Sequence, residues 1–316
     1  MCAARLSLLS NSMGTQQSPI RRLFLGRSRN FHYNGNRISE QHQYRSSRST
    51  TTSSMDYVVD PPRITSLPVV GTNSRFPVRR VYCVGKNYAA HVVEMGGDLE
   101  RSNPVFFTKP SFNGVVYAGS SAFRGGSDGS DSGTTSTSVN YPPNTSNLHY
   151  EVELVVAIGK GIDNNSFSTA THPPASTIDL LDCVYGYAVG IDLTRRDLQG
   201  EAKSKGLPWD TGKYFDESAP MGPITPAATT TTSFEDILDE KTMELTVNGE
   251  TRQSVRLENM IWKVPEIITE LSKSFELKQG DLIMTGTPSG VGPIVAGDRL
   301  VGTIDGLVEK VDITLI

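Results

Sequence analysis

The stretch NLHYEVELVVAIGKG, residues 147–161, contains the clearest signal for the fold and a puzzle about charge. Apolar side chains alternate from Tyr150 to Ile158 and the run ends on glycines, which predicts a buried β-strand. Glu151 and Glu153 lie inside this strand two residues apart, so both side chains point to the same face. Two like charges beside an apolar run repel each other and are costly to desolvate. A cation held between them would offset that cost.

A hard divalent cation, Mg²⁺ or Mn²⁺, is the usual partner of such carboxylate oxygens. The alternative is an exposed strand face that bears two solvated carboxylates. Asp192 is a candidate third ligand, because it follows an apolar strand and precedes a predicted helix, where ligand-binding groups collect. Its simpler role would be that of a turn or cap residue. Three carboxylates would leave coordination positions open for substrate and water.

A histidine and a glutamate on one predicted helical turn are candidates for acid–base chemistry. His91 and Glu94 are three residues apart, so their side chains can meet. A carboxylate beside the imidazole would raise the pKa of His91 and suit it to take a proton from water. An ordinary surface pair is the alternative.

Polar and cationic residues follow Asp192 in the chain. Arg196 and Gln199 share one face of a helix that a capping-box-like pair, Thr194 and Asp197, predicts to begin here. Lys213 follows in a stretch of aromatic and small residues. By themselves these residues also fit a solvated helix face and a surface lysine.

The glycine-rich loop 286–292 follows a predicted buried strand and offers backbone amides and the Thr287 hydroxyl as a cradle for a carboxylate. An ordinary Gly/Pro turn is the alternative. The glycine spacing is not that of a dinucleotide-binding loop, and the Gly-Lys-Ser/Thr of a Walker loop is absent.

Charge is distributed unevenly over the 316 residues, although the formal net charge is only −4. Residues 1–54 contain eight arginines and one acid, Glu40, a formal charge of +7, which leaves −11 for the rest. An Arg- and Ser-rich, acid-poor N-terminus predicts a mitochondrial or plastid transit peptide. A disordered basic tail, or a start codon chosen too far upstream, is the alternative, with a cytoplasmic location.

Several classes of function are disfavoured by composition. No apolar run approaches the roughly 18 residues that span a bilayer, so no membrane partner is expected. The basic N-terminus lacks lysine and interleaved aromatic residues, which argues against nucleic acid. The cysteines Cys2, Cys83 and Cys183 are far apart, which disfavours a disulfide framework and a zinc site.

Strands outnumber helices and are separated by turns, which predicts one mainly-β α+β domain over residues 76–316. Residues 1–75 are expected to be a basic, loop-like extension, and the Gly/Ser/Thr/Asp-rich segment 119–140 a flexible insertion. Besides the opening strand, the elements predicted are strands at 78–85, 104–110, 184–191 and 281–285, helices at 87–95, 194–205 and 264–275, and a hairpin turn at Asn248-Gly249.

Together, segments from about residue 78 to the C-terminus resemble the fumarylacetoacetate hydrolase family, most closely its acylpyruvate- and fumarylpyruvate-hydrolase branch. The segments that carry the resemblance are YCVGKNYAAHVVEMG, PVFFTKP, YPPNTSNLHYEVELVVAIGKG, VYGYAVGIDLTRRDLQGEAKSKGLPWDTGKYFDESAPMGP, LTVNGETRQ, MIWKVPEII and GDLIMTGTPSGVGP. The resemblance implies a mixed β-roll of that family's C-terminal-domain type and a homodimer.

The resemblance also implies a role for each candidate residue. Glu151, Glu153 and Asp192 would hold Mg²⁺ or Mn²⁺. The implied catalytic residues are His91, Glu94 and Lys213, and the implied substrate-binding residues are Arg196, Gln199 and Thr287.

The function that follows is cleavage of the C3–C4 bond of 2,4-diketo acids to pyruvate and a carboxylic acid. The cation, helped by Lys213, would stabilise the enolate charge, and His91 would activate the attacking water. The alternatives are an oxaloacetate decarboxylase or keto–enol tautomerase that uses the same site, and a metal-stabilised scaffold without activity. The binding partner implied by either enzymatic function, hydrolase or oxaloacetate enzyme, is a small oxo-acid substrate.

Overall fold

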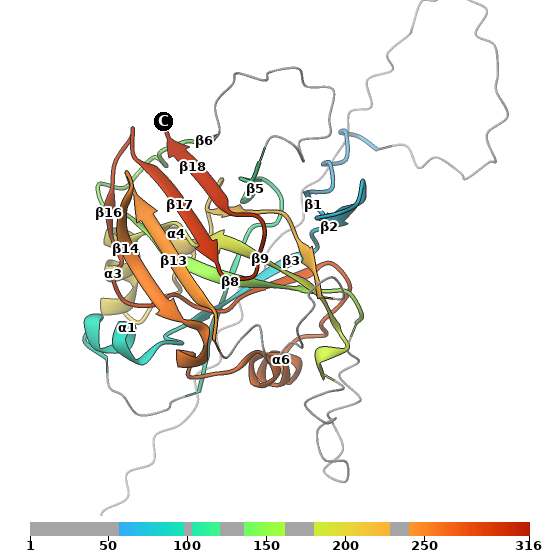
Figure 1. Cartoon of the computed structure of the whole chain (residues 1–316). Coiled ribbons are helices and arrows are strands. Elements are labelled where there is room, and N and C mark those ends of the chain that lie inside the picture. Colours follow the sequence, from blue (N-terminus) through green and yellow to red (C-terminus); the bar gives the residue numbers. More distant parts are fainter. Residues whose placement is uncertain (1–56, 98–102, 121–135, 162–179, 228–239) are drawn as a thin grey trace, which may run out of the picture. The chain divides into compact units, whose positions relative to one another are not determined.

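Strand β8, Val152–Ile158, lies at the centre of the fold and is buried along its whole length. In Figure 1 it runs beside β9, Val184–Ile191, behind a second layer of strands. The two strands pair antiparallel, with Glu153 opposite Gly190 and Leu154 opposite Val189. This computed structural model describes residues 57–97, 103–120, 136–161, 180–227 and 240–316.

The central sheet has eight strands in the order β4-β3-β15-β8-β9-β11-β5, and β12 pairs with β9 beside this path. It is mixed, because β3 with β15 and β5 with β11 are parallel while the other pairs are antiparallel. Its remaining strands are β3 Arg80–Gly85, β4 Val105–Lys109, β5 Val115–Tyr117, β11 Ala219–Met221, β12 Thr225–Pro226 and β15 Asp281–Met284.

A second sheet, in the order β14-β13-β17-β18-β6, covers one face of the central sheet (Figure 1). Its first two strands form the predicted hairpin, and the turn residues Asn248 and Gly249 both have positive φ. Apolar side chains from the two facing sheets form the main core, for example Leu154, Leu245 and Ile313. The strands of the second sheet are β6 Thr137–Val139, β13 Thr242–Val247, β14 Glu250–Arg256, β17 Arg299–Ile304 and β18 Val311–Leu315.

Two small sheets complete the strands. One orders β10-β7-β16 and the other pairs β1 with β2, and their bounds are β1 Ser66–Pro68, β2 Arg75–Pro77, β7 Leu148–Tyr150, β10 Thr194–Arg195 and β16 Gly292–Ile294. The β1–β2 pair packs Leu67 and Phe76 against the opposite face of the central sheet, in a second apolar cluster with Val155 and Met284.

Helices are short and few among the described residues. They are α1 Ala89–Glu94, α3 Arg196–Ser204, α4 Asp210–Lys213, the 3-10 helix η4 Leu257–Asn259, and α6 Val264–Ser272. Helix α6 buries Ile267, Ile268 and Leu271 in the main core, as its amphipathic pattern predicts. None of the helices in this part of the chain is long and apolar enough to cross a membrane.

The predicted fold class, a mainly-β α+β fold with a mixed, curled sheet, is confirmed. Three predicted boundaries differ from the structure. The opening stretch is two strands, β7 and β8, interrupted at Glu151. Ordered structure begins before residue 76, since β1 lies in the predicted extension, and the predicted insertion ends in a strand, β6, whose Val139 is buried. Residues 1–56 and 121–135 lie outside the described part.

The predicted capping box at the start of α3 is wrong. Thr194 lies in strand β10, and its hydroxyl donates to the backbone oxygen of Asp192 at 3.3 Å. Asp197 lies inside the first turn, where its carboxylate accepts from Thr145 Oγ1 at 2.6 Å and from the Ser146 amide at 2.9 Å. Asp197 therefore anchors the loop that contains Thr145 and Ser146 to this helix. Thr194 does not cap the helix and belongs instead to the candidate active site described below.

Candidate active site

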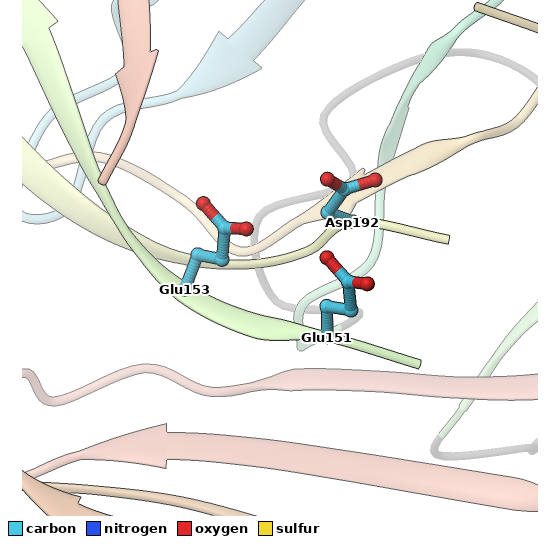
Figure 2. A group of neighbouring side chains, drawn as sticks. All are labelled: Glu151, Glu153 and Asp192. Carbon is cyan, nitrogen blue, oxygen red and sulfur yellow. The ribbon is translucent and has the colours of Figure 1, made fainter. Parts of the chain in front are cut away.

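Three buried carboxylates meet where β7 passes into β8. One oxygen from each of Glu151, Glu153 and Asp192 lies within 4.8 Å of the others. Figure 2 shows the three side chains projecting to the same side of neighbouring strands. Because β9 ends at Ile191 and the Asp192 amide donates to the backbone oxygen of Glu151 at 2.8 Å, the ladder between the two chain segments fixes this spacing.

Lys213 lies directly against two of these carboxylates. Its Nζ donates to Glu151 Oε2 at 2.9 Å, Asp192 Oδ2 at 2.6 Å and Thr194 Oγ1 at 2.7 Å. Helix α4 can bring it there because Gly212 lets the chain approach α3: a Cβ at this position would lie 2.9 Å from Gln199 Cβ. All three N–H donors of the ammonium are thus used by protein groups, so the predicted direct help to the reacting oxygen requires one of these bonds to open.

A second buried lysine, Lys109 in β4, was not predicted from the sequence to belong to the site. Its Nζ lies 2.7 Å from Asp192 Oδ1 and also donates to the backbone oxygens of Leu193 and Lys213, each at 2.9 Å. Only 2% of Lys109 is exposed. The sequence does contain a pattern that could have indicated a buried lysine, because Lys109 ends an apolar strand and precedes a proline. Lysines at strand ends are usually solvated, however, so the pattern alone does not predict burial.

Arg196 supplies a third cation. Its Nη2 forms an ion pair with Glu151 Oε1, and its Nη1 donates to Gln199 Oε1 at 2.6 Å. The prediction that Arg196 and Gln199 share one helix face is therefore confirmed, whereas their role in substrate binding stays a prediction. Since the amide oxygen of Gln199 accepts from Arg196, its NH₂ group can be presented to a ligand.

These contacts shift the pKa values of the carboxyl groups in opposite directions. Burial would raise the pKa of Glu151, but Lys213 and Arg196 outweigh burial and hold it well below the usual range. Burial, together with the neighbouring Asp192 and Glu151 carboxylates, raises the pKa of Glu153 well above its usual value. Glu153 accepts from the Gly286 amide at 2.7 Å, and within the described residues no lysine or arginine forms an ion pair with it.

The two lysines also differ. Burial lowers the pKa of Lys109, although Asp192 opposes it. Burial likewise lowers the pKa of Lys213, but Asp192 and Glu151 outweigh it, so the net pKa of Lys213 is raised. Of the two lysines, Lys213 is therefore the one whose ammonium the acidic cluster stabilises more.

His91 and Glu94 contact each other as predicted. His91 Nδ1 lies 3.0 Å from Glu94 Oε2, and the Gly290 amide donates to Glu94 Oε1 at 3.0 Å. The loop that carries Gly290 thus orients the carboxylate, and the carboxylate orients the imidazole.

Loop 286–292 is not an open cradle. The amides of Gly286 and Gly290 already donate to Glu153 and Glu94. The Thr287 hydroxyl donates to the Val152 backbone oxygen at 2.9 Å and accepts from Gln253 Nε2 at 2.9 Å. This loop therefore holds protein carboxylates in place, and Thr287 can offer a ligand only a remaining lone pair unless its hydroxyl rotates.

A cleft gathers the candidate residues. Those that line it are His91, Glu151, Glu153, Arg196, Gln199, Lys213 and Thr287, with Phe107, Trp209 and the mouth residues Lys86 and Lys203. Glu94 and Asp192 join through the contacts above. The structure therefore brings together all nine residues predicted from the sequence; the role of each stays a prediction.

Residues 80–311 match the sequence profile described as fumarylacetoacetate (FAA) hydrolase C-terminal. The chain belongs to the fumarylacetoacetate hydrolase family. The resemblance inferred from the sequence is confirmed, and the protein is an enzyme of this family.

Individual members of the fumarylacetoacetate hydrolase family are similar over most of their length. A fumarylpyruvate hydrolase from Ralstonia sp is 45% identical over 179 residues, 57% of this chain and 83% of the relative. The human mitochondrial oxaloacetate tautomerase FAHD1 is 39% identical over 233 residues, 73% of this chain and 89% of the relative. The crystal structure of fumarylpyruvate hydrolase from Pseudomonas aeruginosa in complex with Mn²⁺ and pyruvate is 41% identical, with a TM-score of 0.71, covering 83% of this chain and 99% of that chain.

The donor set fits a divalent metal ion. Three buried carboxylates offer hard oxygen ligands, and one of them, Glu153, has a raised pKa and a backbone amide as its partner instead of a cationic side chain. A dication at this point would give the Glu153 carboxylate a positively charged partner. Mg²⁺ and Mn²⁺ both suit such ligands.

Proposed function

We propose that this protein hydrolyses the C3–C4 bond of 2,4-diketo acids such as fumarylpyruvate or acetylpyruvate, with Mg²⁺ or Mn²⁺ as cofactor. The observation that carries the proposal is the His91–Glu94 pair at the same cleft as the three clustered carboxylates. The similarity to two fumarylpyruvate hydrolases supports it.

His91 is the group that we assign to proton transfer. Because Nδ1 faces Glu94 Oε2 at 3.0 Å, the proton of the neutral ring belongs on Nδ1, and Nε2 is left as the acceptor. As Nε2 takes a proton from water, the water oxygen bonds to C4, the C3–C4 bond breaks, and its electron pair passes to C3. His91 then returns the proton to C3, which yields pyruvate and a carboxylic acid.

The remaining side chains orient the substrate. The NH₂ group of Gln199, held by Arg196, would donate to the acyl oxygen, and the Thr287 hydroxyl, once rotated away from Val152, would donate to the C1 carboxylate. A dication held by Glu151, Glu153 and Asp192 would supply positive charge that stabilises the negative charge developing on the substrate.

The charge balance of the acidic cluster, with a dication bound, favours a dianionic substrate. The three carboxylates of the cluster are matched in formal charge by Lys109, Lys213 and Arg196. A dication therefore adds two positive charges, and Lys86 and Lys203 at the mouth add more. Fumarylpyruvate, with a carboxylate at each end, fits this field better than acetylpyruvate does.

A second candidate is keto–enol tautomerisation or decarboxylation of oxaloacetate, also a dianion. It is favoured by the relatives from human and mouse named oxaloacetate tautomerase FAHD1, 39% and 40% identical over 73% of this chain. Tautomerisation needs only proton shuttling, so the His91–Glu94 pair can serve it too.

The test is a substrate panel of fumarylpyruvate, acetylpyruvate and oxaloacetate with purified protein, with Mg²⁺ and with chelator. We expect pyruvate release from the diketo acids, lost with chelator and reduced about 10²–10⁴-fold in a His91→Ala variant. Turnover of oxaloacetate alone would assign the second candidate. No turnover of any of the three with Mg²⁺ present would contradict both.

We further propose a mitochondrial location and a homodimer. The basic N-terminus and the relatives named mitochondrial support the location, whereas the dimer is carried over from the family alone. A fluorescent fusion of the full chain, compared with one that begins at residue 57, tests the first, with cytoplasmic signal in both as the contrary result. Light scattering of purified protein tests the second.

A further inference from the structure

The backbone of Val152, the residue between the two glutamates, is held by side chains on both sides. Its amide donates to Gln253 Oε1 at 2.9 Å, and its carbonyl oxygen accepts from Thr287 Oγ1 at 2.9 Å. Both backbone groups of a strand residue are thus paired with side chains. The peptide that joins Glu151 to Glu153 therefore depends on two side chains for its position.

Gln253 is the more heavily engaged of the two. The residue is 1% exposed, and its Nε2 donates to Thr287 Oγ1 and to the Pro288 backbone oxygen, each at 2.9 Å. A single side chain thus connects strand β14 of the second sheet to strand β8 and to loop 286–292. The contact with β8 is at Val152, between the candidate metal ligands Glu151 and Glu153. The other two contacts are within the loop whose Gly286 amide donates to Glu153.

A β-bulge aims Gln253 at the site. The pairing of β13 with β14 shifts between Leu245, opposite Gln253, and Thr246, opposite Thr251, so Arg252 is the extra residue. Gly290, with φ +95°, packs on this bulge, and a Cβ there would lie 2.2 Å from the Arg252 backbone oxygen. Bulges commonly re-aim a side chain near a functional site.

We propose that Gln253 is a positioning residue for the metal site: it fixes the Val152 peptide, and thereby the separation of the Glu151 and Glu153 carboxylates, while it anchors the loop whose Gly286 amide holds Glu153. This inference rests on the proposed function, since it assigns a support to the same carboxylates. Gln253 does not line the cleft, so the role assigned to it is positioning and not catalysis.

The test measures Mn²⁺ binding by electron paramagnetic resonance titration in the absence of substrate. Gln253→Met keeps the length of the side chain and removes every hydrogen bond, and Thr287→Val removes the bond on the other side of Val152. Thr285→Val is the matched control, because the Thr285 hydroxyl donates at 3.1 Å to Leu154, on the same strand just beyond the carboxylates.

We expect Gln253→Met and Thr287→Val to weaken Mn²⁺ binding about 10- to 100-fold and to broaden the Mn²⁺ spectrum, as is typical when a support of a metal ligand is removed. Thr285→Val should bind Mn²⁺ like the wild type. Wild-type affinity in folded Gln253→Met or in Thr287→Val, or equal weakening in Thr285→Val, would overturn the role of Gln253 alone. A wild-type protein that binds no Mn²⁺ would instead overturn the metal site of the proposed function, and this inference with it.

Discussion

Replacing Lys109 by methionine would test whether the buried cations hold the acidic cluster together. The variant keeps the shape of the side chain but removes the charge from Asp192 Oδ1 and the donors from the Leu193 and Lys213 carbonyls. Breaking a buried ion pair by removing one partner costs about 3–5 kcal/mol. Each buried carbonyl left without a donor adds about 1–3 kcal/mol.

Relief of the desolvated ammonium offsets part of this loss, since burial already lowers the pKa of Lys109. The lower sum of these costs is about 5 kcal/mol, and the offset brings the expected net loss to about 3–5 kcal/mol. For a domain of this size each kcal/mol shifts Tm by roughly 2–4 °C, so Tm should fall by roughly 6–20 °C. The measurement is thermal unfolding followed by circular dichroism in chelator.

Adding Mg²⁺ separates a role at the acidic cluster from a general packing role. In Lys109→Met the Asp192 carboxylate keeps Lys213 as its cationic side chain and gains from a dication, so Mg²⁺ should raise Tm more than in the wild type. Lys205→Met, which removes an exposed pair with Glu201, is the control and should unfold like the wild type. An unchanged Tm in Lys109→Met, or an equal response of both proteins to Mg²⁺, would refute the reasoning.

Three further outcomes follow from named contacts. Glu153→Gln, which keeps the shape but removes the negative charge, should abolish measurable Mn²⁺ binding in the same titration and leave the fold intact by circular dichroism; retained binding would contradict the ligand assignment. Lys203→Met should raise KM for fumarylpyruvate roughly two- to fivefold and leave KM for acetylpyruvate nearly unchanged, since one exposed ion pair contributes about 0.2–1 kcal/mol; equal effects would contradict a role toward a distal carboxylate. Burial raises the pKa of Asp312, but Arg299 and Lys310 outweigh burial and lower it, so its stabilising contribution is present above the unfolded pKa near 4 and is lost as pH falls; Asp312→Asn should therefore be less stable at pH 7, with a difference in urea midpoint that disappears toward pH 3.

Much of the fold was readable from local patterns. The alternation along β8, the apolar run of β9 and the Asn248-Gly249 turn each reflect a rule that acts within a few residues. The break at Glu151 was not readable, because the alternation of apolar residues continues from Tyr150 through Val152 while the chain moves from one sheet to another. Which sheet a strand joins depends on partners far along the chain.

The site residues likewise fall into those that local sequence patterns predict and those that depend on the tertiary structure. The paired glutamates were visible from their spacing, and the resemblance to a family joined the other candidates to them. Lys109 and Gln253 were missed because burial creates their roles, and burial is decided by β3 and the bulge of β14, both remote in sequence. The glycine loop was visible, but the identity of its hydrogen-bond acceptors, Glu153 and Glu94, required the tertiary structure.

The formal charge balance of the acidic cluster has a consequence for the order of binding. Without a dication, the three carboxylates face three cationic side chains, which offset much of the mutual repulsion that raises the pKa of Glu153, so the cluster can fold without a metal. A dianionic oxo acid then meets a nearly neutral cluster, whereas with the dication it meets two extra positive charges. Substrate binding should therefore follow metal binding. Calorimetric titration with oxaloacetate should show binding in Mg²⁺ and none in chelator, and equal affinity in both would indicate that the cationic side chains alone capture the substrate.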